Sequence, residues 1–377
     1  MKNWVVLPLL LAGIAFGQET PRPNGNTGSV DVVIDGPTRG EAIDRILKAL
    51  GDFYVFPEAA RKMTQAIRER EQRKEYDSIT SGKQLAQTLT KHLQEVSRDK
   101  HVRVAVVAGP QAQPRDRQPP VEELEQQRVE LARTNFGFER VERLAGNIGY
   151  VDLRVFHRPG LMGETAAAAM NFLAHTDALI ADLRQNTGGD PAAVALISSY
   201  LFGPEPVHLN DIYWRPSNET RQWWTLPYVP GKRLADRDVY VLTSRLTFSA
   251  GEEFAYNLKS LKRATIVGES TAGGAHPGGP QRVHDHFVVF VPMGRAINPV
   301  TKSNWEGTGV EPDFKVAADR ALKTAHLIAL EKAASKGSGD KGVAMPADSV
   351  SAHRLRGEIT AAIQVLKKEL GDAQEQR

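Results

Sequence analysis

Apolar and polar residues follow two different patterns along the chain, and these patterns divide it into a helical part and a mixed part. In the first hundred residues, apolar positions recur at helical spacing, which predicts helices over 39–53, 57–71 and 82–96. From Gly146 onward, short apolar runs of strand length alternate with helical segments. This alternation predicts an α/β domain with a central, largely parallel sheet, preceded by a helical N-terminal subdomain.

The predicted strands of the mixed part are short apolar runs bounded by polar turns. Strands are expected over 147–153, 178–183, 239–244, 264–269 and 287–294, with helices over 191–202 and 318–334. Residues 213–215 and 222–225 alternate polar and aromatic side chains and predict a hairpin, whose tryptophans either line a substrate groove or pack across the strands. Residues 349–370 predict a charged amphipathic helix that docks on the body or pairs with a partner.

Changes in composition set the expected boundaries between these parts. The expected organisation is a signal peptide (1–17), a flexible segment (18–37), a helical subdomain (38–107), a linker (108–121), an α/β domain (122–336), a second linker (337–348) and a C-terminal helix (349–377).

The first residues indicate export. Residues 1–17 combine Lys2, an apolar centre and a small-residue ending, which is typical of a cleaved secretory signal. The alternative is an uncleaved membrane anchor, for which the apolar stretch is short. We therefore expect a periplasmic or extracellular protein with no stable membrane association after cleavage. A formal net charge of +3 gives no reason to expect a nucleic-acid partner, and a chain without cysteine has no disulfides or thiolate metal sites.

One serine lies where a predicted strand gives way to a predicted helix. The apolar run 239–242 leads into a Ser/Thr-rich turn, and helical spacing begins at Ser249. Such a corner exposes the hydroxyl and directs the free N–H groups of the helix at a bound group. The plain alternative is an ordinary N-cap, in which Ser249 and Glu252 form a capping box.

A second corner carries glycines instead of a hydroxyl. The strand at 178–183 is followed by Gly188 and Gly189 and then by a helix from Pro191. Adjacent glycines let backbone N–H groups approach a ligand closely, as an oxyanion site requires. Two such corners in one domain predict an active site at the carboxyl ends of the sheet.

Three motifs, in this order, resemble those of the tail-specific protease family: DLRQNTGGD, TSRLTFSAGEEFAYNLKSLKRATIVGE and NWEGTGVEPD. The family includes the C-terminal processing peptidases, tricorn protease and the repeats of interphotoreceptor retinoid-binding protein. The resemblance covers about residues 40–335 and implies a mixed α/β, crotonase-like catalytic core. Only about forty residues separate Val104 from the strand at Asn147, which is too few for the PDZ domain that many members insert.

The resemblance also implies a catalytic set. It gives Ser249 as nucleophile, His101 as base, Glu306 as the partner of the base, and oxyanion donors from Ala250 and from Gly188 or Gly189. Each of these side chains has a structural alternative, since a lone histidine or glutamate usually bonds to backbone or pairs with a charge.

Two positions depart from the family pattern. Lys100 stands where the tricorn-like enzymes have serine, and Gly274 stands where the processing peptidases have a lysine base. His276 lies close to the position of the missing lysine and is the rival base to His101. Glu311 is a nearby competitor of Glu306.

The first hypothesis is a secreted serine-type peptidase that hydrolyses peptide bonds through an acyl-enzyme. It would act on peptide or protein substrates, without a cofactor, as a monomer or a homo-oligomer. No metal site is expected, because His284 and His286 share a strand face but lack further ligands. The second hypothesis is a non-catalytic binder of retinoid- or lipid-like apolar ligands on the same fold. An esterase or amidase with the same triad is a third.

Overall fold

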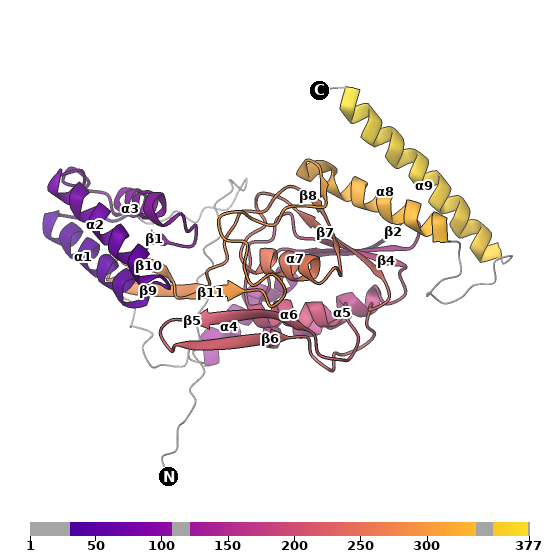
Figure 1. The fold of residues 1–377 in the computed structure, drawn as a ribbon, viewed down its shortest axis with the longest axis horizontal. Coiled ribbons are helices and arrows are strands. Elements are labelled where there is room, and N and C mark those ends of the chain that lie inside the picture. Colours follow the sequence, from indigo (N-terminus) through magenta and orange to yellow (C-terminus); the bar gives the residue numbers. More distant parts are fainter. Residues whose placement is uncertain (1–30, 108–120, 337–349, 376–377) are drawn as a thin grey trace, which may run out of the picture. The chain divides into compact units, whose positions relative to one another are not determined.

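The computed structural model describes residues 31–107, 121–336 and 350–375, and Figure 1 labels their helices and strands. The predicted signal peptide and, except for Val121, both predicted linkers lie outside the described residues. The chain forms two compact units. The first contains the described residues up to Gln126, Trp214–Glu219 and His276–Arg295, and the second contains the remainder. The domain boundaries expected from composition stay a prediction.

The first unit is built from helices and a small antiparallel sheet. Its helices are α1 (Gly36–Phe53), α2 (Pro57–Gln72) and α3 (Gly82–Ser97), and its strands are β1 (Arg103–Val106), β9 (Gly278–His284) and β10 (Phe287–Pro292) in the order β1-β10-β9. Helices α1 and α3 begin at ordinary caps, because the Asp35 and Ser81 side chains accept backbone N–H groups of the first turn. Helix α2 begins with proline, which lacks the N–H that a first helical residue leaves free.

One apolar core joins these helices to the strands. The helices contribute Leu50, Met63 and Leu89, which are fully buried, and strand β10 contributes Phe287 and Val289. The helical spacing read from the sequence therefore marks the faces that pack on this sheet.

The second unit contains a six-stranded sheet with the order β12-β8-β7-β4-β3-β2. Its strands are β2 (Phe138–Leu144), β3 (Ile148–Leu153), β4 (Ala178–Asp182), β7 (Asp238–Thr243), β8 (Thr265–Gly268) and β12 (Phe314–Lys315). All neighbouring pairs are parallel except β2 with β3. The predicted α/β class with a largely parallel sheet is confirmed.

Helices cover both faces of this sheet, so its central strands are apolar on both sides. In β4, Leu179 and Ala181 pack in one core with α5 (Pro159–Phe172), α6 (Pro191–Ser199) and α7 (Ala250–Ser260). The alternate residues Ala178 and Ile180 pack in a second core with α8 (Ala318–Lys336). Side chains of a strand alternate between faces, so one continuous apolar run supplies both cores.

The C-terminal helix α9 (Val350–Glu375) docks on the second unit and runs beside α8 (Figure 1). Its apolar face places Ile359 and Leu366 in the core that α8 lines. The Glu358 carboxylate accepts the backbone N–H of Gly146 at 2.9 Å, which ties the helix to the turn before β3. Of the two expectations for this helix, docking is confirmed.

The remaining described elements include the predicted hairpin. They are α4 (Val121–Ala132), the short 3₁₀ helix η1 (Asn135–Gly137), β5 (His208–Trp214), β6 (Glu219–Trp224) and β11 (Gly294–Ile297), and the strands form a sheet in the order β11-β5-β6. Trp224 stacks on His208 with ring centroids 4.3 Å apart, which is the cross-strand packing expected for one of its tryptophans. None of the described helices has the length and apolar character needed to cross a membrane.

Replacing Ile180 with alanine should lower the free energy of unfolding by about 2–5 kcal/mol, because the side chain is fully buried at the centre of the sheet. Denaturant titration measures this loss. The matched control Val300→Ala, at a position 54% exposed, should change the free energy by less than about 0.5 kcal/mol. Equal losses in the two variants would contradict the assigned core.

Candidate functional site

Ser249 lies at a strand-to-helix corner, as the sequence predicts. Strand β7 ends at Thr243, and Ser249 is the N-cap of α7. Its backbone has φ 53° and ψ −119°, a conformation that non-glycine residues rarely adopt and that costs about 1–3 kcal/mol. The half-buried side chain therefore stands on a strained turn.

Comparison with the other caps separates Ser249 from an ordinary N-cap. Asp35, Ser81 and Asp190 have extended backbones with φ between −98° and −92°, and each side chain accepts an N–H of the following turn. Ser249 keeps the capping-box pairing with Glu252, but only the Glu252 half is a hydrogen bond of normal geometry. The corner is thus shaped for something other than helix capping alone.

The glycine corner lies directly against the serine corner. A Cβ added to Gly188 would come within 2.8 Å of the Ser249 Cβ, so only glycine fits there without a shift. Gly189 has φ 139°, and an added Cβ would lie 2.1 Å from the Phe156 carbonyl oxygen. The Phe248 N–H also donates to the Asn186 carbonyl at 3.0 Å and joins the two corners.

The backbone hydrogen bonds narrow the choice of oxyanion donors. The Gly188 N–H donates to Asn186 Oδ1 at 2.9 Å and is therefore already used. The N–H groups of Gly189 and Ala250 donate to no acceptor among the described residues. Of the two glycines considered from the sequence, Gly189 is the better second donor beside Ala250.

Glu252 is a buried hub that the sequence predicted only as a capping residue. Its carboxyl group accepts the Ser249 N–H at 2.8 Å, the Thr271 hydroxyl at 2.5 Å, and the N–H groups of Gly273 and Gly274 at 2.6 and 2.9 Å. Burial raises the pKa of Glu252 to about 7, although these donors favour the charged form. The hub fixes the Ser249 corner to the loop 271–274, which contains Gly274, the position that the resemblance matched to the lysine of the processing peptidases.

Glu306 is held next to the same loop. Its Oε2 accepts the Ala275 N–H at 2.5 Å, and its own N–H donates to Asn304 Oδ1 at 2.9 Å. The neighbouring Trp305 indole donates to the Gly274 carbonyl at 2.7 Å. The competitor Glu311 is exposed. Of the two glutamates weighed as partner of the base, Glu306 is therefore the one held in a fixed orientation.

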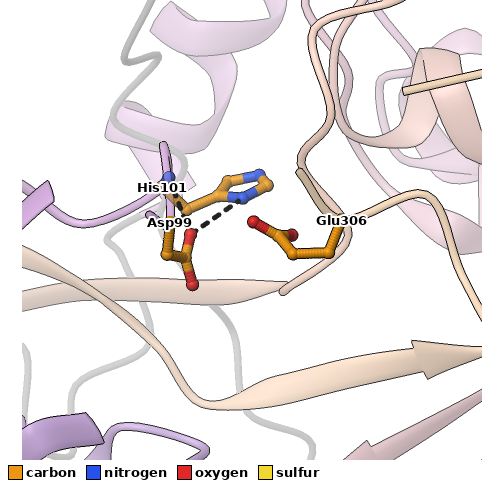
Figure 2. A group of neighbouring side chains, drawn as sticks. All are labelled: Asp99, His101 and Glu306. Carbon is orange, nitrogen blue, oxygen red and sulfur yellow. Dashed lines mark hydrogen bonds and ion pairs between the residues drawn. The ribbon is translucent and has the colours of Figure 1, made fainter. Parts of the chain in front are cut away.

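The two candidate bases, His101 and His276, lie in the first unit around one carboxylate, Asp99. Asp99 is 1% exposed, and its Oδ2 lies 2.8 Å from His276 Nδ1. Tyr54 donates its hydroxyl to the same oxygen at 3.1 Å, and the His101 N–H donates to Oδ1 at 2.9 Å. His101 Nδ1 lies 3.7 Å from Oδ1 (Figure 2).

Sequence reasoning did not select Asp99, although the Asp-x-His spacing was a usable signal. Burial alone would raise the pKa of Asp99, but the His276 hydrogen bond and the neighbouring imidazoles outweigh it and hold that pKa below its usual range. The His276 Nδ1 therefore donates its proton to the Asp99 carboxylate, and this hydrogen bond orients the ring.

His101 is buried and stacks on Phe290, with ring centroids 6.0 Å apart. Burial lowers its pKa to about 4, and Asp99 opposes this shift only in part. The imidazole is thus neutral at physiological pH and able to accept a proton. Ser249 and Glu306, the latter also drawn in Figure 2, belong to the second unit, so the catalytic set itself stays a prediction.

The protein has a largely parallel sheet, and at the carboxyl edge of this sheet a serine on a strained turn lies against the corner that holds two glycines. These features place it among the α/β proteins that present a hydroxyl at this edge. Models of two domains of one family match the chain. Peptidase family S41 matches residues 147–316, and the N-terminal domain of Peptidase_S41 in eukaryotic IRBP matches residues 38–136. The chain belongs to peptidase family S41.

Individual relatives agree with this assignment. The chain is 28% identical over 201 residues to carboxyl-terminal-processing peptidase 1, chloroplastic, of Arabidopsis thaliana, a match that covers 52% of the chain and 39% of the relative. The chain thus spans about two fifths of the curated relative's length.

Two solved structures share the fold. One, from Parabacteroides merdae and described as a candidate peptidase, has a TM-score of 0.55 and 19% identity, covering 79% of this chain and 98% of that one. A lipoprotein from Streptococcus agalactiae has a TM-score of 0.53 and 14% identity, covering 80% and 99%.

Replacing Gly189 with alanine should destabilise the second unit by at least about 2 kcal/mol, because the new Cβ would meet the Phe156 carbonyl at a positive φ. Thermal and denaturant unfolding measure this effect. Gly203→Ala is the matched control, since nothing lies within 4 Å of its added Cβ. A Gly189→Ala protein as stable as Gly203→Ala would rule out the tight corner.

Acidification from pH 6.5 to about 4 should lower the free energy of unfolding through His101. The unfolded imidazole takes up a proton near pH 6.5, whereas the buried one does so only near pH 4. The stability that depends on neutral His101 is therefore present above pH 6.5 and lost as the pH falls to 4, on the order of 3 kcal/mol.

Urea unfolding at steps across this range measures the loss. His101→Gln should lose less stability than wild type over the same range, because it has no imidazole to protonate. Identical pH dependence in the two proteins would show that His101 is not the buried neutral group.

Proposed function

We propose that this chain is a serine-type peptidase that cleaves peptide bonds through an acyl-enzyme on Ser249. The observation that carries this proposal is the backbone of Ser249, strained at φ 53° on a strand-to-helix corner that an ordinary cap does not need. Membership of peptidase family S41 supports the same reaction class.

The reaction would proceed in two steps, acylation of Ser249 and hydrolysis of the acyl-enzyme. The Ser249 Oγ bonds to the substrate carbonyl carbon while a histidine takes its proton, and that proton passes to the leaving amine as the C–N bond breaks. Water then attacks the acyl-enzyme ester, the histidine takes a proton from the water and returns it to Ser249 Oγ, and the new carboxylic acid end of the substrate leaves. The N–H groups of Ala250 and Gly189 would bind the negative oxygen that forms in each step.

The base in this proposal is His101, with Glu306 as its partner, by position in the family motifs. The neutral state of the buried His101 imidazole supports this role, because only a neutral ring accepts a proton. His276 is the alternative base. Its Nδ1 bond to Asp99 leaves Nε2 as the accepting nitrogen, which is the geometry that a histidine base requires.

The proposed substrates are peptides or proteins, and the proposed location is outside the cytoplasm. The name of the Arabidopsis thaliana relative, a carboxyl-terminal-processing peptidase, supports a polypeptide substrate. The pattern of residues 1–17 supports export.

A fluorophosphonate probe should label the purified protein at Ser249, because the proposed base makes this hydroxyl nucleophilic. Intact-mass and peptide mass spectrometry measure the labelling. Ser249→Ala should lose all labelling, and His101→Gln should slow it by about 10²-fold or more. The control Ser335→Ala, an exposed serine on α8, should be labelled like wild type.

Each alternative predicts a different result. Labelling that survives His101→Gln but is lost in His276→Gln would move the base to His276. A folded wild-type protein that is never labelled would overturn the peptidase proposal and favour the binding hypothesis. Labelled protein that cleaves ester substrates but no peptide library would favour the esterase hypothesis.

A further inference from the structure

Glu253 is a second buried glutamate beside the nucleophile, and the proposed mechanism gives it no role. It is 4% exposed and follows Ser249 by one helical turn in α7, where its N–H donates to the Ser249 carbonyl at 2.9 Å. Residues four apart share one helix face, and helical side chains lean toward the N-terminus. This geometry directs the Glu253 side chain toward the N-terminal end of α7, where Ser249 is the cap and where Asp190 is close enough to influence its pKa.

One polar neighbour of Glu253, the amide of Asn257, has an orientation fixed by hydrogen bonds. Asn298 Oδ1 accepts the N–H groups of Val300 and Thr301, at 2.9 and 3.1 Å, so its amide nitrogen must point the other way. That nitrogen donates to Asn257 Oδ1 at 3.2 Å. The Asn257 Nδ2 is consequently the atom left to face Glu253.

A small set of buried polar atoms surrounds this carboxyl group without pairing with it. Within the described part of the chain, Glu253 Oε1, Asn257 Nδ2 and both amide atoms of Asn210 make no hydrogen bond of normal geometry. Asn210 and Asn257 are nevertheless close enough to lower the pKa of Glu253. These donors and acceptors lie too far apart for direct hydrogen bonds. Their spacing leaves room for a bridging water, and a protonated Glu253 could itself donate a hydrogen bond.

Among the described residues, the charges that shift the pKa of Glu253 include no cation, and Arg158 pairs with Asp190 at 3.8 Å. Asp190 is the N-cap of α6 and directly follows the glycine corner. Its negative charge opposes ionisation of Glu253. Strand β8 (TIVG) carries no titratable side chain. On β5, His208 and Asp211 pair with each other at 2.7 Å.

The charged groups of α7 itself are also engaged elsewhere. Lys259 pairs with Asp313 at 2.9 Å. Glu252 accepts four donors, whereas Glu253 Oε1 has none, so the two neighbouring carboxyl groups have opposite environments. Burial, with a smaller contribution from Asp190, raises the pKa of Glu253 to about 8.

We propose that Glu253 is a neutral carboxylic acid held behind the serine and glycine corners, and that its ionisation suppresses the reactivity of Ser249. A negative charge formed there would oppose the negative charge that develops on the substrate oxygen between the corners. Glu253 would act on the reaction through this field without touching the substrate. The inference rests on the proposed peptidase function.

The test compares the pH dependence of fluorophosphonate labelling in wild type and Glu253→Gln, because glutamine mimics the neutral acid and cannot ionise. Between pH 7 and pH 9 the wild-type rate constant, divided by that of Glu253→Gln, should fall roughly tenfold. His101 does not titrate in this range, since its pKa is about 4. The control Glu164→Gln, at an exposed position, should follow the wild-type profile.

A ratio of the two rate constants that stays constant from pH 7 to pH 9 would overturn the proposal that Glu253 controls the reactivity of Ser249. Infrared difference spectra of wild type against Glu253→Gln provide a readout independent of activity. They should contain the C=O band of a protonated carboxylic acid at pH 7, and this band should disappear as the pH rises through about 8. Absence of the band at pH 7 would overturn the neutral acid.

Failure of the proposed function gives a different pattern. A wild-type protein that is unlabelled at every pH would refute the peptidase and, with it, the control of reactivity, while the infrared band still decides the state of Glu253. If Glu253→Gln does not fold, Glu253→Met, which also cannot ionise, replaces it as the reference, because wild type alone does not separate the band of Glu253 from that of Glu252, whose pKa is about 7.

Discussion

The close approach of two strand-to-helix corners is the constraint on which the second unit depends. Strands β4 and β7 are parallel neighbours, with Asp182 opposite Leu242, so both strands end at the same edge of the sheet. Their corners then meet, and Gly188 lies so near Ser249 that a methyl group would not fit. Parallel pairing thus brings the hydroxyl and the glycine N–H groups together, and the absence of a side chain lets them remain there.

Buried carboxyl groups are the second recurring feature. Asp152 and Asp182 pair with Arg154 and Arg184, each at 2.6 Å, whereas Asp99 and Glu252 are held by hydrogen-bond donors without lysine or arginine. Glu252 is surrounded by N–H and hydroxyl donors, and Asp99 by a tyrosine, a backbone N–H and an imidazole. These donors favour the charged form of each group, although burial still raises the pKa of Glu252 to about 7. Glu253 has amide neighbours that pair with it poorly and an anion nearby, so burial favours its neutral form. At Asp99, Glu252 and Glu253, hydrogen-bond donors set against burial therefore decide how readily the carboxyl group ionises.

The sequence predicted the fold well because burial on both faces leaves a strong local pattern. The apolar run around Ile180 and the helical spacing after Ser249 each identify an element without knowledge of the rest of the chain. The serine and glycine corners followed from the same reasoning. The class of the fold needed no long-range information.

The details of the site could not be predicted, because they depend on contacts between distant residues. The partners Asp99 and His276 are 177 residues apart, and nothing local marks their pairing. The use of the Gly188 N–H by Asn186 also depends on how one turn folds back on itself. The positive φ of Ser249 is imposed by packing on a residue whose own preference is the opposite.

The loop 271–275 explains why the Ser249 corner stays intact although Gly274 stands where the processing peptidases have lysine. Its N–H groups at Gly273 and Gly274 hold Glu252, and the next N–H, at Ala275, holds Glu306. The loop therefore supports two carboxyl groups through its backbone, whatever side chain stands at position 274. Glycine there removes a possible base but leaves this support in place, so the proposed reaction relies on a histidine as its proton acceptor without losing the geometry of the corner.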